Sequence, residues 1–204
     1  TPDDLAGSYA CRGLTAYSAL KKANPEKGDN SLIIVSAGGL GLLALKIAKA
    51  AYDINPIIVD IDDEKLELAK KAGASEVINS THEGAFEKLF ELTGGGAKYV
   101  VDYVGAQASV SFGYNLLRRG GIYVVTGLFG GSMNLQLPML TIGARSLVGT
   151  YVGSYQEMKE LMELVKDGKI DPVPVESKPV KEINGILDDL KNGKVPGLVS
   201  ISHN

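Results

Sequence analysis

The stretch IIVSAGGLG, residues 33–41, decides how the rest of the sequence is interpreted. Its first half is a short run of mainly β-branched residues, which predicts a buried strand. Its second half is a glycine-rich turn that leads into a helical pattern. Phosphate-binding turns at this place follow the pattern G-x-G-x-x-G, and Ser36, Gly38 and Gly41 stand at its three glycine positions, with Gly39 as an addition. The turn therefore indicates a phosphate site at the start of a helix.

Strand-like apolar runs and amphipathic helical patterns alternate on both sides of this turn. The runs expected to form strands are residues 31–37, 56–61, 75–79, 98–104, 121–127 and 146–152. The helical patterns are residues 9–23, 40–51, 64–74, 85–96, 106–119 and 155–169. Strands this uniformly apolar are buried on both faces, and their alternation with helices requires parallel pairing through right-handed crossovers. The predicted fold class is α/β, a doubly wound six-stranded parallel sheet of the Rossmann type in the order 3-2-1-4-5-6.

The first helical pattern contains the only cysteine of the chain, Cys11. Ala10, Leu14, Tyr17 and Leu20 lie close to one face of this pattern. From the residues alone Cys11 is a nucleophile, a small apolar residue or a metal ligand, and burial as a small apolar residue is what the isolated sequence favours. A single cysteine cannot form an intramolecular disulfide, so a reducing, cytoplasmic setting is expected.

Composition and charge argue against several classes of partner. The 24 acidic and 21 basic side chains leave a slightly negative balance, which gives no electrostatic reason to expect nucleic acid or an anionic membrane. No apolar run is long enough to span a bilayer, and the first residues lack the pattern of a signal peptide. The sequence therefore predicts a globular α/β protein with no nucleic-acid or membrane partner.

Asp60 ends the second predicted strand, 19 residues after Gly41. A carboxylate at this distance from a phosphate-binding turn accepts hydrogen bonds from the hydroxyls of an adenosine ribose and repels a 2′-phosphate. Asp62 and Asp63 add negative charge nearby and no arginine follows directly, which favours NAD over NADP. The competing interpretations are a tight turn that binds nothing and a solvated carboxylate at a strand end. Turn, helix and spacing together favour cofactor binding.

Ser36 departs from the glycine pattern. The first glycine of the pattern serves a tight turn, so we expect Ser36 to keep a negative φ, at which a Cβ is tolerated. Because Gly38, Gly39 and Gly41 are retained, NAD binding is expected to persist.

Six motifs along the chain are similar to those of one known family. They are CRGLTAYSAL, VSAGGLG, VDIDDEKLELAKKAGA, VVDYVG, RRGGIYVVTG and LKNGKVPGLVSI, and they run in family order. On these motifs the chain resembles the nucleotide-binding lobe of the medium-chain dehydrogenase/reductase superfamily, specifically of the zinc-dependent alcohol dehydrogenases. The resemblance covers nearly the whole chain.

The resemblance implies a protein of two lobes, whose N-terminal catalytic lobe is absent from this sequence. Residues 1–24 would be the helix entering from the missing catalytic lobe, residues 25–170 the NAD-binding Rossmann domain, and residues 171–204 a tail returning to the catalytic lobe. The tail begins with the proline-spaced, half-polar stretch DPVPVESKPV, and its elements have no obvious place in a six-stranded sheet.

The resemblance also implies a set of cofactor-binding residues. They are Ala37, Gly38, Gly39 and Leu40 for the pyrophosphate, Asp60 and Lys65 for the adenosine ribose, Val104 and Gly105 for the adenine-side ribose or the nicotinamide path, and Thr126, Thr150 and Thr15 for the nicotinamide side. For Lys65 the alternative is a solvated helix lysine, and for Val104, Thr126 and Thr150 it is ordinary packing in the sheet. Leu198 stands where the family often has an arginine facing the pyrophosphate, so one charge-assisted contact is expected to be missing.

The family reaction is hydride transfer between an alcohol and the nicotinamide, with zinc as Lewis acid. A catalytic zinc needs about three protein ligands, and Cys11 matches the position of one of them. His82 and His203 are interpreted as solvated rather than as ligands. The isolated chain is therefore expected to bind NAD and to contain no catalytic residue, with zinc present only in the full-length enzyme.

The leading hypothesis is the NAD-binding part of a zinc-dependent alcohol dehydrogenase, with a small alcohol or carbonyl compound as substrate. The alternatives are a non-catalytic NAD-binding module or subunit, a zinc-free quinone-type reductase, and another nucleotide binder such as a methyltransferase. Cys11 disfavours the reductase, and the later motifs disfavour the methyltransferase. The resemblance also implies a homodimer through the apolar edge strand, residues 146–152, unless the preceding loop covers that edge.

Overall fold

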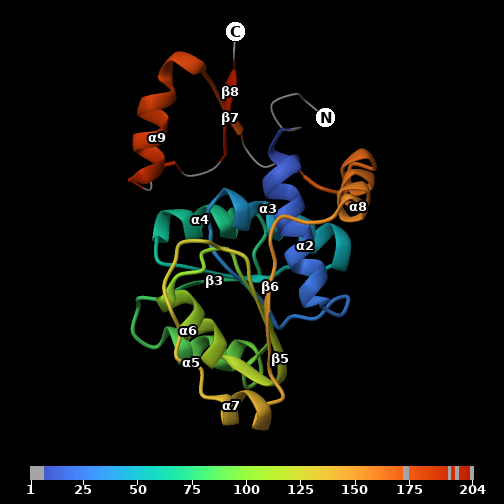
Figure 1. Cartoon of the computed structure of the whole chain (residues 1–204), viewed down its shortest axis with the longest axis vertical. Coiled ribbons are helices and arrows are strands. Elements are labelled where there is room, and N and C mark those ends of the chain that lie inside the picture. Colours follow the sequence, from blue (N-terminus) through green and yellow to red (C-terminus); the bar gives the residue numbers. More distant parts are fainter. Residues whose placement is uncertain (1–6, 172–174, 193, 196–197, 203–204) are drawn as a thin grey trace.

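The computed structural model describes residues 7–171, 175–192, 194–195 and 198–202 and contains an open sheet with helices on both faces (Figure 1). The sheet has the strand order β3-β2-β1-β4-β5-β6, and every neighbouring pair is parallel. The strands are β1 (Leu32–Val35), β2 (Ile57–Asp60), β3 (Glu76–Asn79), β4 (Ala97–Asp102), β5 (Leu117–Val125) and β6 (Ser146–Gly149). The predicted fold class and strand order are therefore confirmed.

Helices cover both faces of the sheet because successive strand residues point to opposite sides. Ile34 belongs to a core shared with α2, α3 and α8, whereas its neighbour Ile33 belongs to a second core shared with α5 and α6. The helices are η1 (a π-helix, Tyr9–Gly13), α2 (Leu14–Ala23), α3 (Gly39–Tyr52), α4 (Asp63–Lys71), α5 (Ala85–Leu92), α6 (Gln107–Asn115), α7 (Leu137–Ile142), α8 (Tyr155–Lys166), η2 (a 3₁₀-helix, Val180–Glu182) and α9 (Ile183–Lys191). In the part of the chain that the structure describes, no helix has the length and apolar character needed to cross a membrane.

The first helical segment begins with a π turn that the sequence pattern did not predict. The N–H of Leu14 bonds to the carbonyl of Tyr9, five residues earlier. The wider turn buries Tyr9 and Gly13 and leaves Ala10 exposed. Ala10 therefore does not share the buried face of Leu14, because the spacing of an α-helix does not apply in this turn.

The edge strand β6 is shorter than the sequence pattern predicted. It ends at Gly149, whereas the apolar run extends to residue 152. Val152 has a φ of 52°, in the left-handed region that a β-branched residue rarely adopts. The chain therefore turns away from the sheet toward α8 before the apolar run is complete.

The C-terminal tail forms a sheet of its own. Strands β7 (Val175–Pro179) and β8 (Leu198–Ser202) pair in parallel and make no pair with the six-stranded sheet. Leu198 opens β8 and is buried in the core that α2 and α3 share. Leu198 is therefore an apolar packing residue of this core. The predicted domain boundaries after residues 24 and 170 are not tested and stay predictions.

Asp102 ends β4 and is fully buried, with hydrogen-bond donors around both carboxylate oxygens. Oδ1 accepts from the N–H groups of Val104 (2.7 Å) and Gly105 (2.9 Å). Oδ2 accepts from the hydroxyls of Ser109 (2.8 Å) and Tyr123 (2.6 Å). Burial and then the charge of Asp102 raise the pKa of Tyr123, so its hydroxyl remains a donor. The loop after β4 is therefore built around this carboxylate.

Asp102→Ala should lower the free energy of unfolding by about 3 kcal/mol, because four donors, including the buried hydroxyl of Tyr123, lose a charged acceptor. Urea denaturation followed by circular dichroism measures the change. Asp171→Ala is the matched control, since Asp171 is exposed and lies 3.5 Å from Lys46 Nζ. The control should change the free energy of unfolding by less than about 1 kcal/mol. Equal losses in the two variants would contradict this account of Asp102.

Candidate functional site

The turn between β1 and α3 contains a strained serine. Ser36 has a φ of 132°, so the expectation of a negative φ is wrong. The cause is the close packing of α3, because a Cβ built on Gly41 would lie 1.9 Å from the carbonyl oxygen of Ser36. The helix start therefore holds residue 36 in a conformation that suits glycine. Ser36 Oγ accepts a hydrogen bond from the N–H of Gly38 (3.2 Å), which offsets part of the strain.

The start of α3 presents backbone donors next to this turn. The first helical hydrogen bond runs from the N–H of Leu42 to the carbonyl of Gly38 (2.9 Å). The N–H groups of Gly39 and Leu40 precede it and have no partner within the helix. A Cβ built on Gly38 would meet only Ser36 Oγ, at 3.5 Å, so the space over this glycine is open. Open donors and the partial positive charge of a helix N-terminus suit a phosphate group.

Asp60 lies at the end of β2 and contacts the turn directly. Its Oδ2 accepts a hydrogen bond from the N–H of Ala37 (2.6 Å), and its Oδ1 accepts from the N–H groups of Ile61 (2.8 Å) and Asp62 (3.2 Å). A carboxylate offers about four acceptor positions, so one stays free for a ligand. The side chain of Ala37 is buried and its N–H is used by Asp60, although the sequence assigned this residue to the pyrophosphate.

Lys65, which the sequence placed beside the ribose, forms an ion pair with Asp62. Its Nζ lies 3.1 Å from Asp62 Oδ2. Asp62 also caps α4 by accepting hydrogen bonds from the N–H groups of Glu64 (3.0 Å) and Lys65 (3.2 Å). The hydrogen bond from the Lys65 side chain, followed by that from its backbone, lowers the pKa of Asp62. Asp62 and Lys65 therefore offset each other's charge.

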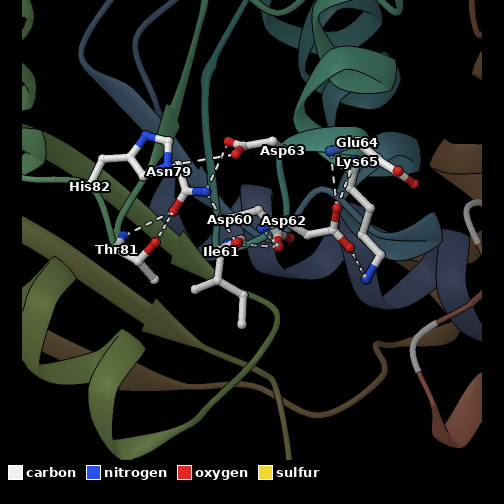
Figure 2. Close-up of polar contacts among 9 residues, drawn as sticks. All are labelled: Asp60, Ile61, Asp62, Asp63, Glu64, Lys65, Asn79, Thr81 and His82. Carbon is white, nitrogen blue, oxygen red and sulfur yellow. Dashed lines mark hydrogen bonds and ion pairs between the residues drawn. The ribbon is translucent and has the colours of Figure 1, made fainter.

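Asn79 ends β3 and holds the same loop, although no sequence motif singled it out (Figure 2). Its amide nitrogen donates to the carbonyl of Ile61 (3.1 Å) and to Asp63 Oδ1 (2.9 Å). Asp63 also lies 3.6 Å from His82 Nε2. A cavity of about 380 Å³ lies beside this cluster, lined by residues of α4, β3 and α5 and by none of the phosphate turn. The one feature of the sequence that could have indicated Asn79 is its position. It is a polar residue at the end of a predicted strand, at the same edge of the sheet as Asp60.

The loops after β4 and β5 bring Val104, Gly105 and Thr126 together at this edge of the sheet. A Cβ built on Gly105 would lie 2.0 Å from the carbonyl oxygen of Gly127, so the two loops cross in backbone contact. Thr126 is buried, and its hydroxyl has no hydrogen-bond partner among the described residues. Buried hydroxyls normally have a partner, so a rotation about χ1 that offers this one to a ligand would satisfy it.

The hydroxyls of Thr150 and Thr15 already have partners in the protein. Thr150 follows β6, its N–H bonds to the carbonyl of Val125 (3.1 Å), and its hydroxyl lies 3.3 Å from Ser18 Oγ. Thr15 donates its hydroxyl proton to the carbonyl of Cys11 (2.7 Å). Thr150 thus lies at the same edge of the sheet as Thr126. The hydroxyl of Thr15, by contrast, bonds to a carbonyl within the first helical segment.

Cys11 is exposed, so its interpretation as a buried apolar residue is wrong. The π turn buries Tyr9 and Gly13, which lie two residues to either side, and leaves Cys11 exposed. Within the described residues, no three His, Cys, Asp or Glu side chains form a group that could hold a metal ion. His82 lies beside Asp63, and His203 is outside the described residues. Cys11 alone cannot make a zinc site, which needs about three protein ligands.

Ser36→Gly should raise the free energy of unfolding by about 1 kcal/mol, because the strain relieved exceeds the entropic cost of a further glycine. Ser36→Ala is the matched control, since it keeps the Cβ at the strained φ and loses the hydrogen bond from Gly38. The free energy of unfolding of this control should fall by about 1 kcal/mol. Urea denaturation of both variants tests the prediction, and a loss of stability in Ser36→Gly would refute it.

Comparisons with known proteins agree with the fold described above. Residues 39–167 match the family model described as zinc-binding dehydrogenase. The NAD-dependent alcohol dehydrogenases of Sulfolobus acidocaldarius and Sulfurisphaera tokodaii are 37% and 33% identical to this chain, over 94% of it and 56% of each relative.

Solved structures show the same likeness. The alcohol dehydrogenase of the archaeon Aeropyrum pernix superposes with a TM-score of 0.86 at 34% identity, over 95% of this chain and 56% of that one. The acetophenone reductase of Geotrichum candidum, solved in complex with NAD, has a TM-score of 0.84 at 26% identity, over 96% of this chain and 55% of that one. The chain spans about half the length of these relatives, 55–56%. By its sequence and its fold, it belongs to the zinc-binding dehydrogenase family.

Proposed function

We propose that this chain is the NAD-binding part of a zinc-dependent alcohol dehydrogenase, which transfers hydride between an alcohol and NAD. The observation that carries the proposal is the 2.6 Å hydrogen bond from the N–H of Ala37 to Asp60 Oδ2. This bond joins Asp60, the carboxylate proposed to bind the ribose, to the turn at the start of α3, the proposed phosphate site. The relatives that are NAD-dependent alcohol dehydrogenases, and the reductase solved with NAD, support the choice of cofactor.

The pyrophosphate would lie over Gly38 and accept hydrogen bonds from the N–H groups of Gly39 and Leu40. The open space over Gly38 and the absence of helical partners for these donors support this placement. The two phosphates would replace water at the positive end of α3. Ser36 Oγ, which accepts from Gly38, keeps its own hydroxyl proton available for a phosphate oxygen.

The adenosine would bind between Asp60 and Ile61. The free acceptor position of Asp60 would take a ribose hydroxyl, and its charge would repel a 2′-phosphate. Ile61 is 70% exposed although it is a large apolar side chain. Stacking of an adenine ring on Ile61 would remove this apolar surface from water. The two residues would therefore hold the ribose and the base side by side.

The nicotinamide would lie where the loops after β4 and β5 cross. Val104 and Gly105 would form the wall of this part of the site, and the unpartnered hydroxyl of Thr126 would offer a hydrogen bond. When bound, NAD supplies the acceptor for the hydride, and this chain's residues orient it. Thr150 lies at the same edge and completes the proposed set.

For zinc, the described residues provide one candidate ligand and do not fit a metal site by themselves. We infer that Cys11 is one of about three ligands and that the others lie in the part of the full-length relatives that this chain does not cover. No catalytic step is assigned to zinc or to Cys11. The chain alone would therefore bind NAD without catalysis, and an alcohol or carbonyl substrate would require the whole enzyme.

A homodimer through residues 146–152 completes the proposal. Among the described strands β6 pairs with β5 on one side and with none on the other. Leu147 on β6 is 40% exposed, and none of the residues of the neighbouring helix α7 is buried. An exposed apolar edge strand invites pairing with another chain, which supports a contact between two copies.

Asp60→Ala should weaken NAD binding about 30-fold, because a charged acceptor for the ribose is lost. NADP binding should change less, so the preference for NAD narrows. Isothermal titration calorimetry with both cofactors measures this. Glu64→Ala is the matched control, since Glu64 is an exposed carboxylate on the same loop–helix segment. Unchanged selectivity in Asp60→Ala would rule out the role assigned to Asp60.

Leu147→Lys should convert the dimer into a monomer, because a charge on an edge strand opposes pairing. Analytical ultracentrifugation over a range of protein concentrations measures the assembly. Leu92→Lys is the control, since Leu92 is similarly exposed, at 42%, but lies on α5. A wild-type chain that stays monomeric, or a Leu147→Lys variant that still dimerises, would disprove the edge-strand dimer.

A further inference from the structure

Asn79 uses all of its side-chain hydrogen-bonding groups to join the end of β3 to the loop after β2 (Figure 2). Its amide nitrogen donates to the carbonyl of Ile61 (3.1 Å) and to Asp63 Oδ1 (2.9 Å). Its amide oxygen accepts from the N–H (2.9 Å) and the hydroxyl (2.6 Å) of Thr81. The residue is 8% exposed, so water hardly competes for these bonds.

The peptide groups that Asn79 holds are those that orient Asp60. The peptide group between Ile61 and Asp62 makes this connection, because its carbonyl accepts from Asn79 and its N–H donates to Asp60 Oδ1 (3.2 Å). The N–H of Ile61 also donates to Asp60 Oδ1 (2.8 Å). The backbone adds a second tie, because the N–H of Ser80 donates to the carbonyl of Asp60 (2.9 Å). Asp60 Oδ2 then bonds to the N–H of Ala37 in the phosphate turn. A continuous chain of hydrogen bonds therefore runs from β3 through Ile61 and Asp60 to the phosphate turn.

We propose that Asn79 is a positioning residue for the adenosine half of the cofactor. It fixes the peptide that carries Ile61 and thereby the direction of the Asp60 carboxylate. This inference rests on the proposed function and adds to it a residue from outside the ribose and phosphate contacts. Asn79 itself does not touch the phosphate turn, so it acts through Asp60 and Ile61.

An amide is the group that this position requires. The two N–H donors of Asn79 meet two acceptors, the carbonyl of Ile61 and the carboxylate of Asp63, while its oxygen meets two donors from Thr81. A carboxylate would face both acceptors without a proton to donate. An alanine would leave the carbonyl of Ile61 without its side-chain donor, and only backbone bonds would connect the loop to the end of β3.

His82 makes a weaker contact in the same cluster and serves as the control. Its Nε2 lies 3.6 Å from Asp63 Oδ2, and the two side chains are 64% and 67% exposed. Exposed ion pairs contribute little to stability and are screened by salt. His82→Ala thus removes a contact to Asp63 without disturbing the buried amide.

The first experiment is a double-mutant cycle between Asn79 and Asp60, with ADP-ribose and NAD as probes in isothermal titration calorimetry. With Asp60 present, Asn79→Ala should weaken the binding of ADP-ribose about 10-fold. In the Asp60→Ala background the same substitution should weaken it less than about 3-fold, because the group that Asn79 orients is gone. His82→Ala should leave the affinity unchanged.

Urea denaturation of the same proteins separates positioning from stability. Asn79→Ala should lower the free energy of unfolding to a similar extent with and without Asp60, although its effect on affinity depends on Asp60. An equal loss of affinity in the two backgrounds would overturn the proposal, since a merely structural role needs no carboxylate at position 60. Unchanged affinity in folded Asn79→Ala would overturn it as well.

A rescue experiment tests the same point with a side chain of the same shape at position 79. Asn79→Asp should weaken the binding of ADP-ribose at least as much as Asn79→Ala does. Adding Asp63→Asn should recover part of the affinity, because the new amide at position 63 donates to the new carboxylate at position 79. Absence of any recovery in a folded double variant would count against the proposal. A wild-type chain that binds neither ADP-ribose nor NAD would refute the proposed function and, with it, this role of Asn79.

Discussion

The close approach of Gly41 to the carbonyl oxygen of Ser36 is the constraint on which the rest of the site depends. A Cβ at Gly41 would lie 1.9 Å from that oxygen, so α3 packs against the end of β1 at backbone contact distance. This packing sets the path of the turn and forces Ser36 to a φ of 132°. It also brings the N–H of Ala37 within 2.6 Å of Asp60, which lies on another strand. The turn between β1 and α3 and the carboxylate of Asp60 are therefore two parts of one packed unit.

Three strands that follow one another in the chain end in polar side chains that organise the loops after them. Asp60 at the end of β2, Asn79 at the end of β3 and Asp102 at the end of β4 each bond to backbone groups of the next few residues or of a neighbouring loop. The reason is general, because backbone groups beyond the last strand pair of a parallel sheet lose their partners and must find others when they are buried. At this edge the side chains supply some of those partners.

Of the three carboxylates near the phosphate turn, Asp60 differs from Asp62 and Asp63 in its bonding partners. Asp62 is engaged by Lys65 and by the start of α4, and Asp63 is engaged by Asn79 and His82. Among the described residues Asp60 bonds to backbone N–H groups and forms no ion pair, so no side-chain cation offsets its charge beside the phosphate turn. The sequence suggested that three carboxylates together discriminate between the cofactors. The structure favours Asp60 for this proposed role, because Asp62 is paired with Lys65 and Asp63 is bonded to Asn79.

The sequence by itself determined the layers of the fold and the order of the strands, because buried parallel strands require continuous apolar runs and crossover helices require the spacing between them. It also located the phosphate turn and Asp60, since both depend on residues close together in the chain. Only the tertiary structure decided the φ of Ser36, the exposure of Cys11 and the hydrogen bonds of Asn79. Each of these depends on packing or hydrogen bonds that the spacing of residue types does not encode: helix packing on a strand end, a π turn, and an amide that reaches the loop of a neighbouring strand.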